Sequence, residues 1–410
     1  MVNSWIIPGM LKWLSAILAG TLLTLPLQTS QAAGPKAGTI CNKLYQKQTY
    51  AGKRYICIRS GRKLVWDKGV NLYSPSPSPS SSSELSPSPL STLPPVAVTV
   101  TFDNLIQNEK NISFTAWEKA SKVILASSAK NAPVNIFTGP KTTPLFEETS
   151  LPVSLVSRLF PNNEEAKTVI WIRYGYDDIA WAESLVKEKL SSSDFEQITR
   201  NQGGALAPSN CESSLKICRG SYQQTGPSGT ALIMQGVPSV SGPYSPSSDP
   251  NFITGQLEAH EYLHSLQRIP MLNKNLPRWA PAWWREGSAD WVKFASVNYL
   301  DYTVYKKSLM DSCASDCIKL SEADINEMLS TVNGESLAPK FSSFLNYTIG
   351  SQVIEKLVSI KGPSIIIDLY VEMGKGQSFE DAFNTVMNEK WADAIPILSQ
   401  SVFDNLHPSS

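Results

Sequence analysis

The chain has 410 residues, of which 42% are hydrophobic and 18% charged, and this is enough for two or three domains with a sizeable core. Its 36 Lys and Arg residues balance 36 Asp and Glu residues. A chain without excess positive charge gives no reason to expect a nucleic-acid partner. The balance hides an asymmetry, because residues 34–70 are basic and the remainder of the chain is acidic. The basic side chains of that segment are Lys36, Lys43, Lys47, Lys53, Arg54, Arg59, Arg62, Lys63 and Lys68, against Asp67 alone.

The N-terminal residues 1–32 are predicted to be a signal peptide. Lys12 precedes an apolar stretch at 13–27, and small residues follow near Ala32, where a signal peptidase would cleave. The apolar stretch is short for crossing a bilayer. A retained membrane anchor stays open as the alternative, because Pro26 and the long start depart from the usual pattern. We expect a secreted or cell-surface protein with no transmembrane span in its mature form.

The six cysteines fit an oxidising compartment. Their spacing favours local disulfides, and no C-x-x-C pair suggests a thiolate zinc site. The expected pairs are Cys41 with Cys57, Cys211 with Cys218, and Cys313 with Cys317.

Residues 33–72 are predicted to be a small basic β module. Aromatic and β-branched runs alternate with turn residues at 51–52 and 60–61, which is typical of hairpins. The module could attach the protein to an anionic cell-surface polymer, or its charge could simply form a solvated face. Residues 73–97 are rich in Ser and Pro and are predicted to be an extended linker.

The remaining chain changes character near residue 251. Before it, helical spacing at 113–130 and 178–190 alternates with strand-like runs at 133–137, 168–175 and 229–236. After it the pattern is mostly helical, including 344–362 and two short helices within 364–391 that break at 374–376. The third histidine of the chain, His407, is expected in a frayed tail.

One stretch carries chemistry. Residues 260–264 read HEYLH, and an apolar stripe beside them predicts a helix that stops near Pro270. On a helix, His260 and His264 share one face and can bind the same metal ion, with Glu261 projecting beside them.

Two imidazoles leave a tetrahedral zinc ion short of a protein ligand. A second helix, beginning after Pro281, offers Glu286 as that ligand. Four residues later, Asp290 lies on the same face and could accept the free N–H of a ligating histidine.

The motif HEYLH followed by EGSAD resembles the gluzincin metallopeptidases, whose pattern is H-E-x-x-H and then E-x-x-x-D on the next helix. The segment WWREGSADW is similar to W-x-x-E-G-x-A-[DE] of the aminopeptidase-like branch, the peptidase MA group. Tyr347 in NYTIG resembles the tyrosine of its Y-x-x-G motif. The resemblance covers roughly residues 250–390, and upstream there is no convincing counterpart of the branch's G-x-M-E-N loop.

The resemblance implies an α+β gluzincin fold, with a mixed β-sheet upper lobe at 98–250 and a mainly helical lower lobe at 251–410. It implies a zinc-dependent peptidase of peptide or protein substrates, with His260, His264 and Glu286 as metal ligands. Glu261 would be the general base and Tyr347 the donor to the oxyanion. A sheet edge of the upper lobe would pair with the substrate, and 230–235 is either that edge or an interior strand.

Two other functions remain open from the sequence. The chain could be an inactive descendant whose metal only holds two helices together, serving as a surface-binding protein. It could also hydrolyse a non-peptide amide. Four tryptophans near the third ligand are assigned to the core rather than to a cleft: Trp279, Trp283, Trp284 and Trp291.

Overall fold

The computed structural model describes residues 34–42, 47–50, 53–60, 63–66, 70–71, 97–128, 132–239, 249–274, 279–313, 316–332 and 340–408. The chain divides into two compact units, 1–91 and 92–410. The predicted signal peptide and residues 73–96 of the predicted linker lie outside the described residues. Across the described ranges, no helix combines the length and the apolar character that a membrane span requires.

The first unit contains a four-stranded antiparallel sheet, as the alternating pattern indicates. Its second strand pairs with the other three. The Cys41–Cys57 disulfide packs with Trp66 to form its small core. The strands are β1 (Lys47–Tyr50), β2 (Lys53–Ser60), β3 (Lys63–Trp66) and β4 (Val70–Asn71).

The second unit is built on a mixed four-stranded sheet of order β5-β6-β10-β9. The strands are β5 (Val134–Thr138), β6 (Thr168–Tyr174), β9 (Gly220–Thr225) and β10 (Thr230–Gly236). β5 and β10 run parallel to β6, and β9 runs antiparallel to β10. The two central strands read as continuous hydrophobic runs because both of their faces are buried.

The position of β10 decides between the two alternatives for residues 230–235. It lies between β6 and β9, so 230–235 is an interior strand and cannot add a substrate strand. The edge strands are β5 and β9, and the sequence GSYQQT of β9 carries no strand-like alternation of hydrophobic residues.

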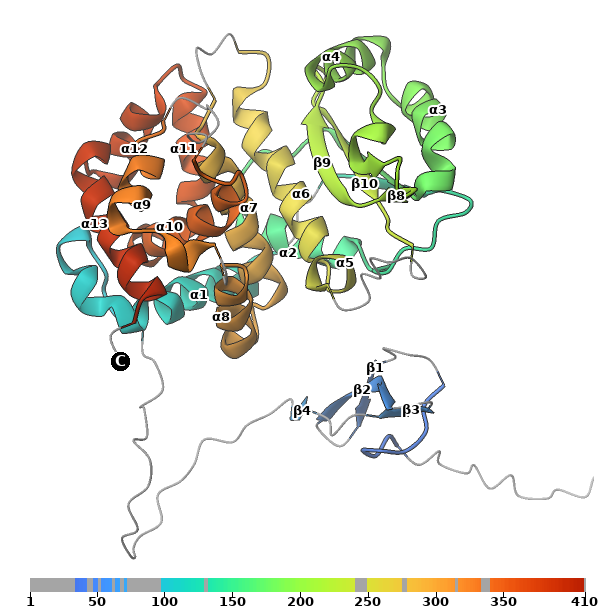
Figure 1. Ribbon diagram of the computed structural model, residues 1–410, viewed down its shortest axis with the longest axis horizontal. Helices are drawn as coiled ribbons and strands as arrows, with labels where there is room; N and C mark the ends of the chain where they lie inside the picture. Colours follow the sequence, from blue (N-terminus) through green and yellow to red (C-terminus); the bar gives the residue numbers. More distant parts are fainter. Residues whose placement is uncertain are drawn as a thin grey trace, which may run out of the picture. The chain divides into compact units, whose positions relative to one another are not determined.

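Helices cover both faces of this sheet. On one face, α3 (Ile179–Lys189) and α4 (Ser192–Gln202) pack on a separate core. On the other, α2 (Ser150–Leu159) and α6 (Gln256–Arg268) join the main core. Figure 1 shows α6 between the sheet and the large group of helices. The short strands β7 (Cys211–Glu212) and β8 (Ile217–Cys218) are joined by the Cys211–Cys218 disulfide.

The remaining helices form the second part of this unit. They are α1 (Glu109–Ala126), α5 (Pro250–Ile253), α7 (Ala282–Val297), α8 (Tyr302–Asp311), α9 (Glu322–Leu329), α10 (Leu345–Lys361), α11 (Ile365–Met373), α12 (Phe379–Met387) and α13 (Trp391–Leu406). Short 3-10 turns occur at η1 (Phe102–Asn104), η2 (Ile106–Asn108), η3 (Tyr176–Asp178), η4 (Ala207–Asn210), η6 (Ile269–Met271) and η7 (Cys317–Lys319). The third disulfide, Cys313–Cys317, lies between α8 and α9.

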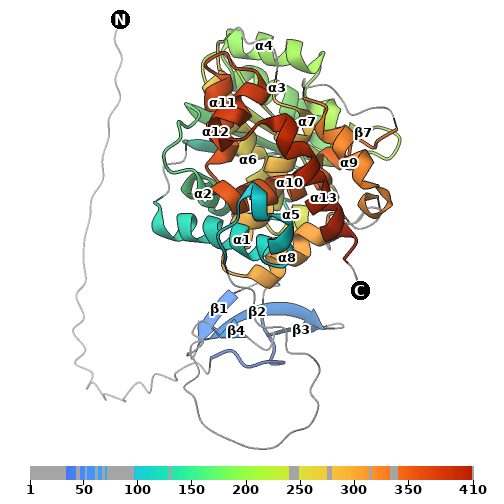
Figure 2. The ribbon, with the colours of Figure 1, turned by 90° about the vertical axis from the view of Figure 1, so that its left-hand side faces the viewer.

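The helical part includes α1, although α1 comes from the segment assigned to the upper lobe. Glu109 pairs with the buried Lys356 of α10 at 2.9 Å. Lys119 donates to the Ser359 carbonyl at 2.7 Å. Figure 2 shows α1 beside α10 and α13, so the helical lobe is not confined to 251–410.

His407 is held by contacts with other described residues, so the expectation of a frayed tail at this position is wrong. α13 runs to Leu406, and Nε2 of His407 lies 2.9 Å from the Ile318 carbonyl. The His407 ring stacks on Phe403. The predicted break at 374–376 is present, because α11 ends at Met373 and α12 begins at Phe379.

Two glycines let α7 and α10 touch backbone to backbone. A Cβ added to Gly287 would collide with Gly350, and one added to Gly350 would collide with the Trp283 carbonyl oxygen. Gly287 directly follows Glu286, and Gly350 lies one helical turn after Tyr347. The close approach therefore fixes how these two side chains are placed relative to each other.

We expect Gly350→Ala to lower the free energy of unfolding by about 1–3 kcal/mol, because overpacking forces two helix backbones apart. Denaturant unfolding measures the effect. Lys361→Ala, at the exposed end of the same helix, is the control. Equal stability of the two variants would show that the contact at Gly350 can relax without cost.

Candidate metal centre

The HEYLH residues lie on α6, as predicted. The helix starts after Gly255, which has φ +86° and contacts so close that an added Cβ would lie 2.9 Å from Phe146. Only glycine combines that φ with so little space. The turn directs α6 between the sheet and α7, where His260 and Glu261 are buried. One helical turn separates His260 from His264, so the two rings share a face.

α7 supplies the third group, as the E-x-x-x-D spacing indicates. It begins after Pro281 and faces α6, so Glu286 points at the two imidazoles. His260 Nε2 and His264 Nε2 are 3.1 Å apart. Glu286 Oε2 is 3.5 Å from the first nitrogen and 3.3 Å from the second. These are the three groups, among the described residues, that come close enough together to hold a metal ion.

Neighbouring side chains fix the tautomers of both imidazoles. Nδ1 of His260 lies 2.8 Å from Asp290 Oδ1, and a carboxylate can only accept. Nδ1 of His264 lies 2.8 Å from Gln267 Oε1, and the amide nitrogen of Gln267 donates to the Arg285 carbonyl and to Ser288. When the imidazoles are neutral, both Nδ1 atoms therefore carry the hydrogen, and both Nε2 atoms present a lone pair on the side of Glu286.

The spacing fits a tetrahedral ion. Zinc bonds of about 2.0–2.1 Å at tetrahedral angles set ligand atoms about 3.3–3.4 Å apart. The observed separations of 3.1, 3.3 and 3.5 Å surround that value. Two imidazole nitrogens and a carboxylate oxygen are also a ligand set that zinc commonly takes. The three residues can therefore hold a divalent metal ion.

Without a metal ion, protons must relieve the repulsion among these lone pairs. Burial lowers the pKa of His260, but hydrogen bonds to Asp290 and Glu286 outweigh burial and raise that pKa to about 9. Burial raises the pKa of Glu286, but the two imidazoles and Arg285 outweigh it and hold the pKa well below its usual value. Glu286 thus stays ionised, and its negative charge favours the binding of a cation at this centre.

Glu261 lies beside the three ligands without joining them. It is 3% exposed, and its Oε2 has no hydrogen-bond partner among the described residues. Burial raises the pKa of its carboxyl group, opposed by the charges of His260 and His264. A buried carboxylate oxygen without a partner is costly, so its presence calls for a chemical reason.

The structure also brings Tyr347 to this centre. Its ring, on α10, stacks on His260 with ring centroids 5.9 Å apart, and it lines the same cleft as Glu261. Burial raises the pKa of its hydroxyl group, so the hydroxyl stays protonated and can donate. Asp290 contacts His260, where the sequence placed it.

The centre opens into a cleft of about 660 Å³ between β9 on one side and α7, α10 and α11 on the other. Ser221 to Thr225 of β9 form one wall. Trp279 also lines it and is 44% exposed, so its assignment to the core was wrong. Trp283, Trp284 and Trp291 are fully buried, as expected.

Three further residues act on the centre and were missed from the sequence. Gln267 holds His264, and Lys293 binds Asp290 at 2.7 Å. Each lies three residues after its partner on the same helix, so an i,i+3 search could have found them. Arg285 donates from Nε to Glu286 Oε1 at 2.8 Å, and no periodicity marks a neighbour in sequence as a partner.

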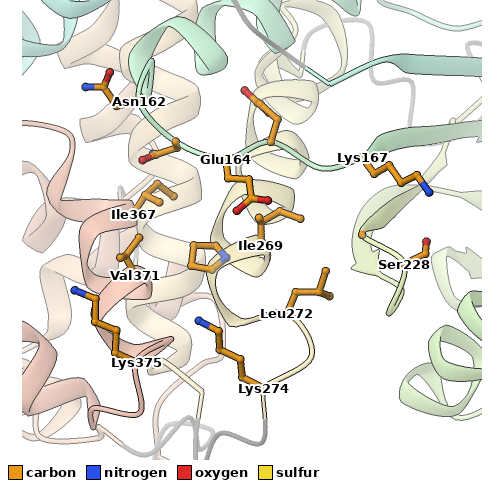
Figure 3. Close-up of a pocket in the computed structure, with 14 residues that line it drawn as sticks. Asn162, Glu164, Lys167, Ser228, Ile269, Leu272, Lys274, Ile367, Val371 and Lys375 are labelled. Carbon is orange, nitrogen blue, oxygen red and sulfur yellow. The ribbon is translucent and has the colours of Figure 1, made fainter.

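A second cavity of about 610 Å³ lies beyond the end of α6. Figure 3 shows Glu164, Lys274 and Lys375 around it, with Ile367 and Val371 from α11 on one side. The neighbouring Glu165 accepts from the hydroxyl of Tyr262 at 2.6 Å. This carboxylate therefore helps to fix α6 and does not belong to a second metal centre.

Comparison with known proteins adds no relatives. No family model matches the chain, and no curated protein or solved structure shows a significant match.

Metal affinity should depend on pH through His260. A metal ion must displace its proton below pH about 9, so the apparent affinity for Zn²⁺ should fall about tenfold for each pH unit below that value. Competition with a chromogenic chelator, from neutral to mildly acidic pH, measures this slope. Asp290→Asn removes one group that raises the pKa and should flatten the slope. A slope of zero in the unmodified protein would contradict proton displacement at His260.

Proposed function

We propose that this protein is a zinc-dependent hydrolase of peptide bonds, of the gluzincin type. One observation carries the proposal. Two imidazole nitrogens and a carboxylate oxygen converge within 3.1–3.5 Å, and a second carboxylate, Glu261, lies buried beside them with one oxygen, Oε2, that has no hydrogen-bond partner among the described residues. The motif spacing from Glu261 to Glu286 and Tyr347 supports the same function.

The number of ligands favours catalysis over a structural role for the metal. Structural zinc sites usually have four protein ligands, whereas catalytic sites have three and leave one position open. The described residues supply three groups, and the position beside them opens on a cleft. A structural site would also have no use for the free carboxylate of Glu261.

When bound, zinc supplies Lewis-acid chemistry toward water and a carbonyl oxygen. Glu261 accepts a proton from water as the new C–O bond forms and passes that proton to the nitrogen as the C–N bond breaks. The hydroxyl of Tyr347 donates to the carbonyl oxygen while it carries negative charge. Asp290 and Gln267 hold the two imidazoles in the required tautomers.

The substrate is proposed to be an extended peptide or an unfolded protein segment. β9 pairs with β10 on one side only, and Ser221 to Thr225 line the cleft. A peptide added to this strand would run past Glu261 with its backbone held by hydrogen bonds.

The three disulfides support a secreted or cell-surface location, since such bonds persist in oxidising compartments. Attachment to an anionic cell-surface polymer through residues 33–72 is proposed on the charge of that segment.

Glu261→Gln should keep the metal and abolish turnover. The amide has nearly the same shape but cannot accept the proton of water. Hydrolysis of an unfolded protein substrate, with and without a chelator, measures activity, and metal analysis of the same sample measures occupancy. Glu188→Gln, on the exposed surface of α3, is the control.

The outcomes of that experiment separate the candidate functions. Chelator-sensitive proteolysis that is lost in Glu261→Gln supports the proposal. A stoichiometric metal without hydrolysis of any peptide would favour the inactive surface-binding protein or a hydrolase of another amide. Full activity in Glu261→Gln would refute the role of this carboxylate.

Tyr347→Phe should lower kcat by about 100- to 1,000-fold, because the variant lacks one hydrogen bond made to the developing oxyanion. KM should change little, since the phenyl ring still packs on His260. Steady-state kinetics on a short peptide separates the two constants. An unchanged kcat would return Tyr347 to the role of a packing residue.

A further inference from the structure

The charged side chains that line the cleft differ in whether they belong to the metal centre. Among the described residues that line it, the carboxylates are Glu261 and Glu286, and both belong to the centre itself. The cations are Arg268 and Arg285. The two imidazoles also belong to the centre, and the other polar groups are neutral amides, hydroxyls and an indole. The part of the cleft that a substrate would occupy therefore carries positive charge.

Arg285 has spare donors. Its Nε is bonded to Glu286 Oε1 at 2.8 Å, and its side chain is 39% exposed. None of the described residues accepts a hydrogen bond from its two terminal nitrogens. A guanidinium held in this way presents a planar pair of donors that matches a carboxylate.

Tyr370 of α11 provides an independent observation. It lines the cleft and is 1% exposed, yet its hydroxyl has no hydrogen-bond partner among the described residues. Arg285 lines the same cleft. A buried hydroxyl is expected to have a partner, and a ligand in the cleft can supply one.

We propose that Arg285 and Tyr370 form a subsite for a carboxylate of the substrate, next to the scissile bond, with Arg268 adding positive potential. This inference rests on the proposed hydrolase function, because the bound ligand is taken to be the substrate of that hydrolase. Arg285 directly precedes Glu286 on α7 and lines the same cleft as Tyr347, so the bound carboxylate lies near the carbonyl to be cleaved. The carboxylate comes from the C-terminus of a peptide or from an acidic side chain.

The same charges disfavour recognition of a free N-terminus. An ammonium group needs a carboxylate that is not otherwise engaged, and the described lining of the cleft offers none beyond Glu261 and Glu286. The cleft therefore selects peptides for an anionic group and not for a free amine.

Peptide binding to the Glu261→Gln protein, loaded with zinc, tests the subsite without hydrolysis. The probes are N-acetylated trialanine with a free C-terminal carboxylate, its C-terminal amide, and amidated peptides that end in Glu or in Gln. The free acid should bind about ten- to a hundredfold more tightly than its amide if the C-terminus is recognised. If the side chain is recognised, the peptide that ends in Glu should bind more tightly than the peptide that ends in Gln, by the same factor.

Arg285→Met should remove the preference, and Tyr370→Phe should reduce it without altering the ring. Arg200→Met, on α4, is the control for loss of a guanidinium. Equal binding of acids and amides, or a preference that survives in Arg285→Met, would overturn the subsite. If Arg285→Met does not fold, two other results test the subsite: the effect of Tyr370→Phe, and the ratio of the affinities for the acid and the amide in the Glu261→Gln protein.

The two proposals fail in different ways. Preference for acids without hydrolysis by the unmodified protein would keep the subsite and reject the hydrolase. Hydrolysis of acids and amides at equal rates, together with equal binding, would keep the hydrolase and reject the subsite.

Discussion

The centre depends on an electrostatic conflict that the surrounding residues hold in place. His260 and His264 cannot turn away from each other, because each Nδ1–H is bound by an acceptor, Asp290 or Gln267. Glu286 cannot turn away either, because Arg285 holds its second oxygen. Three lone-pair donors therefore face one point inside a buried site. Only a cation can satisfy all three, and a proton satisfies them less well than a divalent ion because it bonds to one or two atoms at a time.

The residues around the two imidazoles also determine the net charge of the centre. Asp290 is shared between His260 and Lys293, at 2.8 and 2.7 Å from its Oδ1. Its negative charge is thus offset locally, which leaves Glu286 and Glu261 as the anions beside the two imidazoles. The two carboxylates differ in their contacts. Glu286 is bonded to Arg285 and has a depressed pKa, whereas Glu261 is buried and has a raised pKa. A candidate ligand with a lowered pKa and a carboxylate with a raised pKa therefore lie side by side, and the proposed hydrolysis uses both.

Part of this arrangement could be predicted from the sequence, and the reason is periodicity. The i,i+4 spacing of His260 and His264, and of Glu286 and Asp290, determines which side chains share a helix face. The pairing of those two faces was predicted from the resemblance of the segments. The strands of the sheet and the helical part could likewise be anticipated from hydrophobic spacing, whereas the mixed sheet was implied by the resemblance. By contrast, β9 is polar throughout and becomes a strand because β10 offers it an edge to pair with.

The two residues of the proposed subsite, Arg285 and Tyr370, could not be predicted from the sequence, because their positions depend on tertiary contacts. Arg285 stands next to Glu286 in sequence, where side chains on a helix normally diverge, and only the bend of its long side chain brings Nε back to the carboxylate. Tyr370 comes from α11, far along the chain, and reaches the cleft because α11 packs against the end of α6. Both residues sit on helices whose buried faces the hydrophobic pattern describes well. The neighbouring helices determine where their polar ends lie. The proposed selectivity of the cleft therefore depends on tertiary packing, while the candidate metal ligands follow from local spacing.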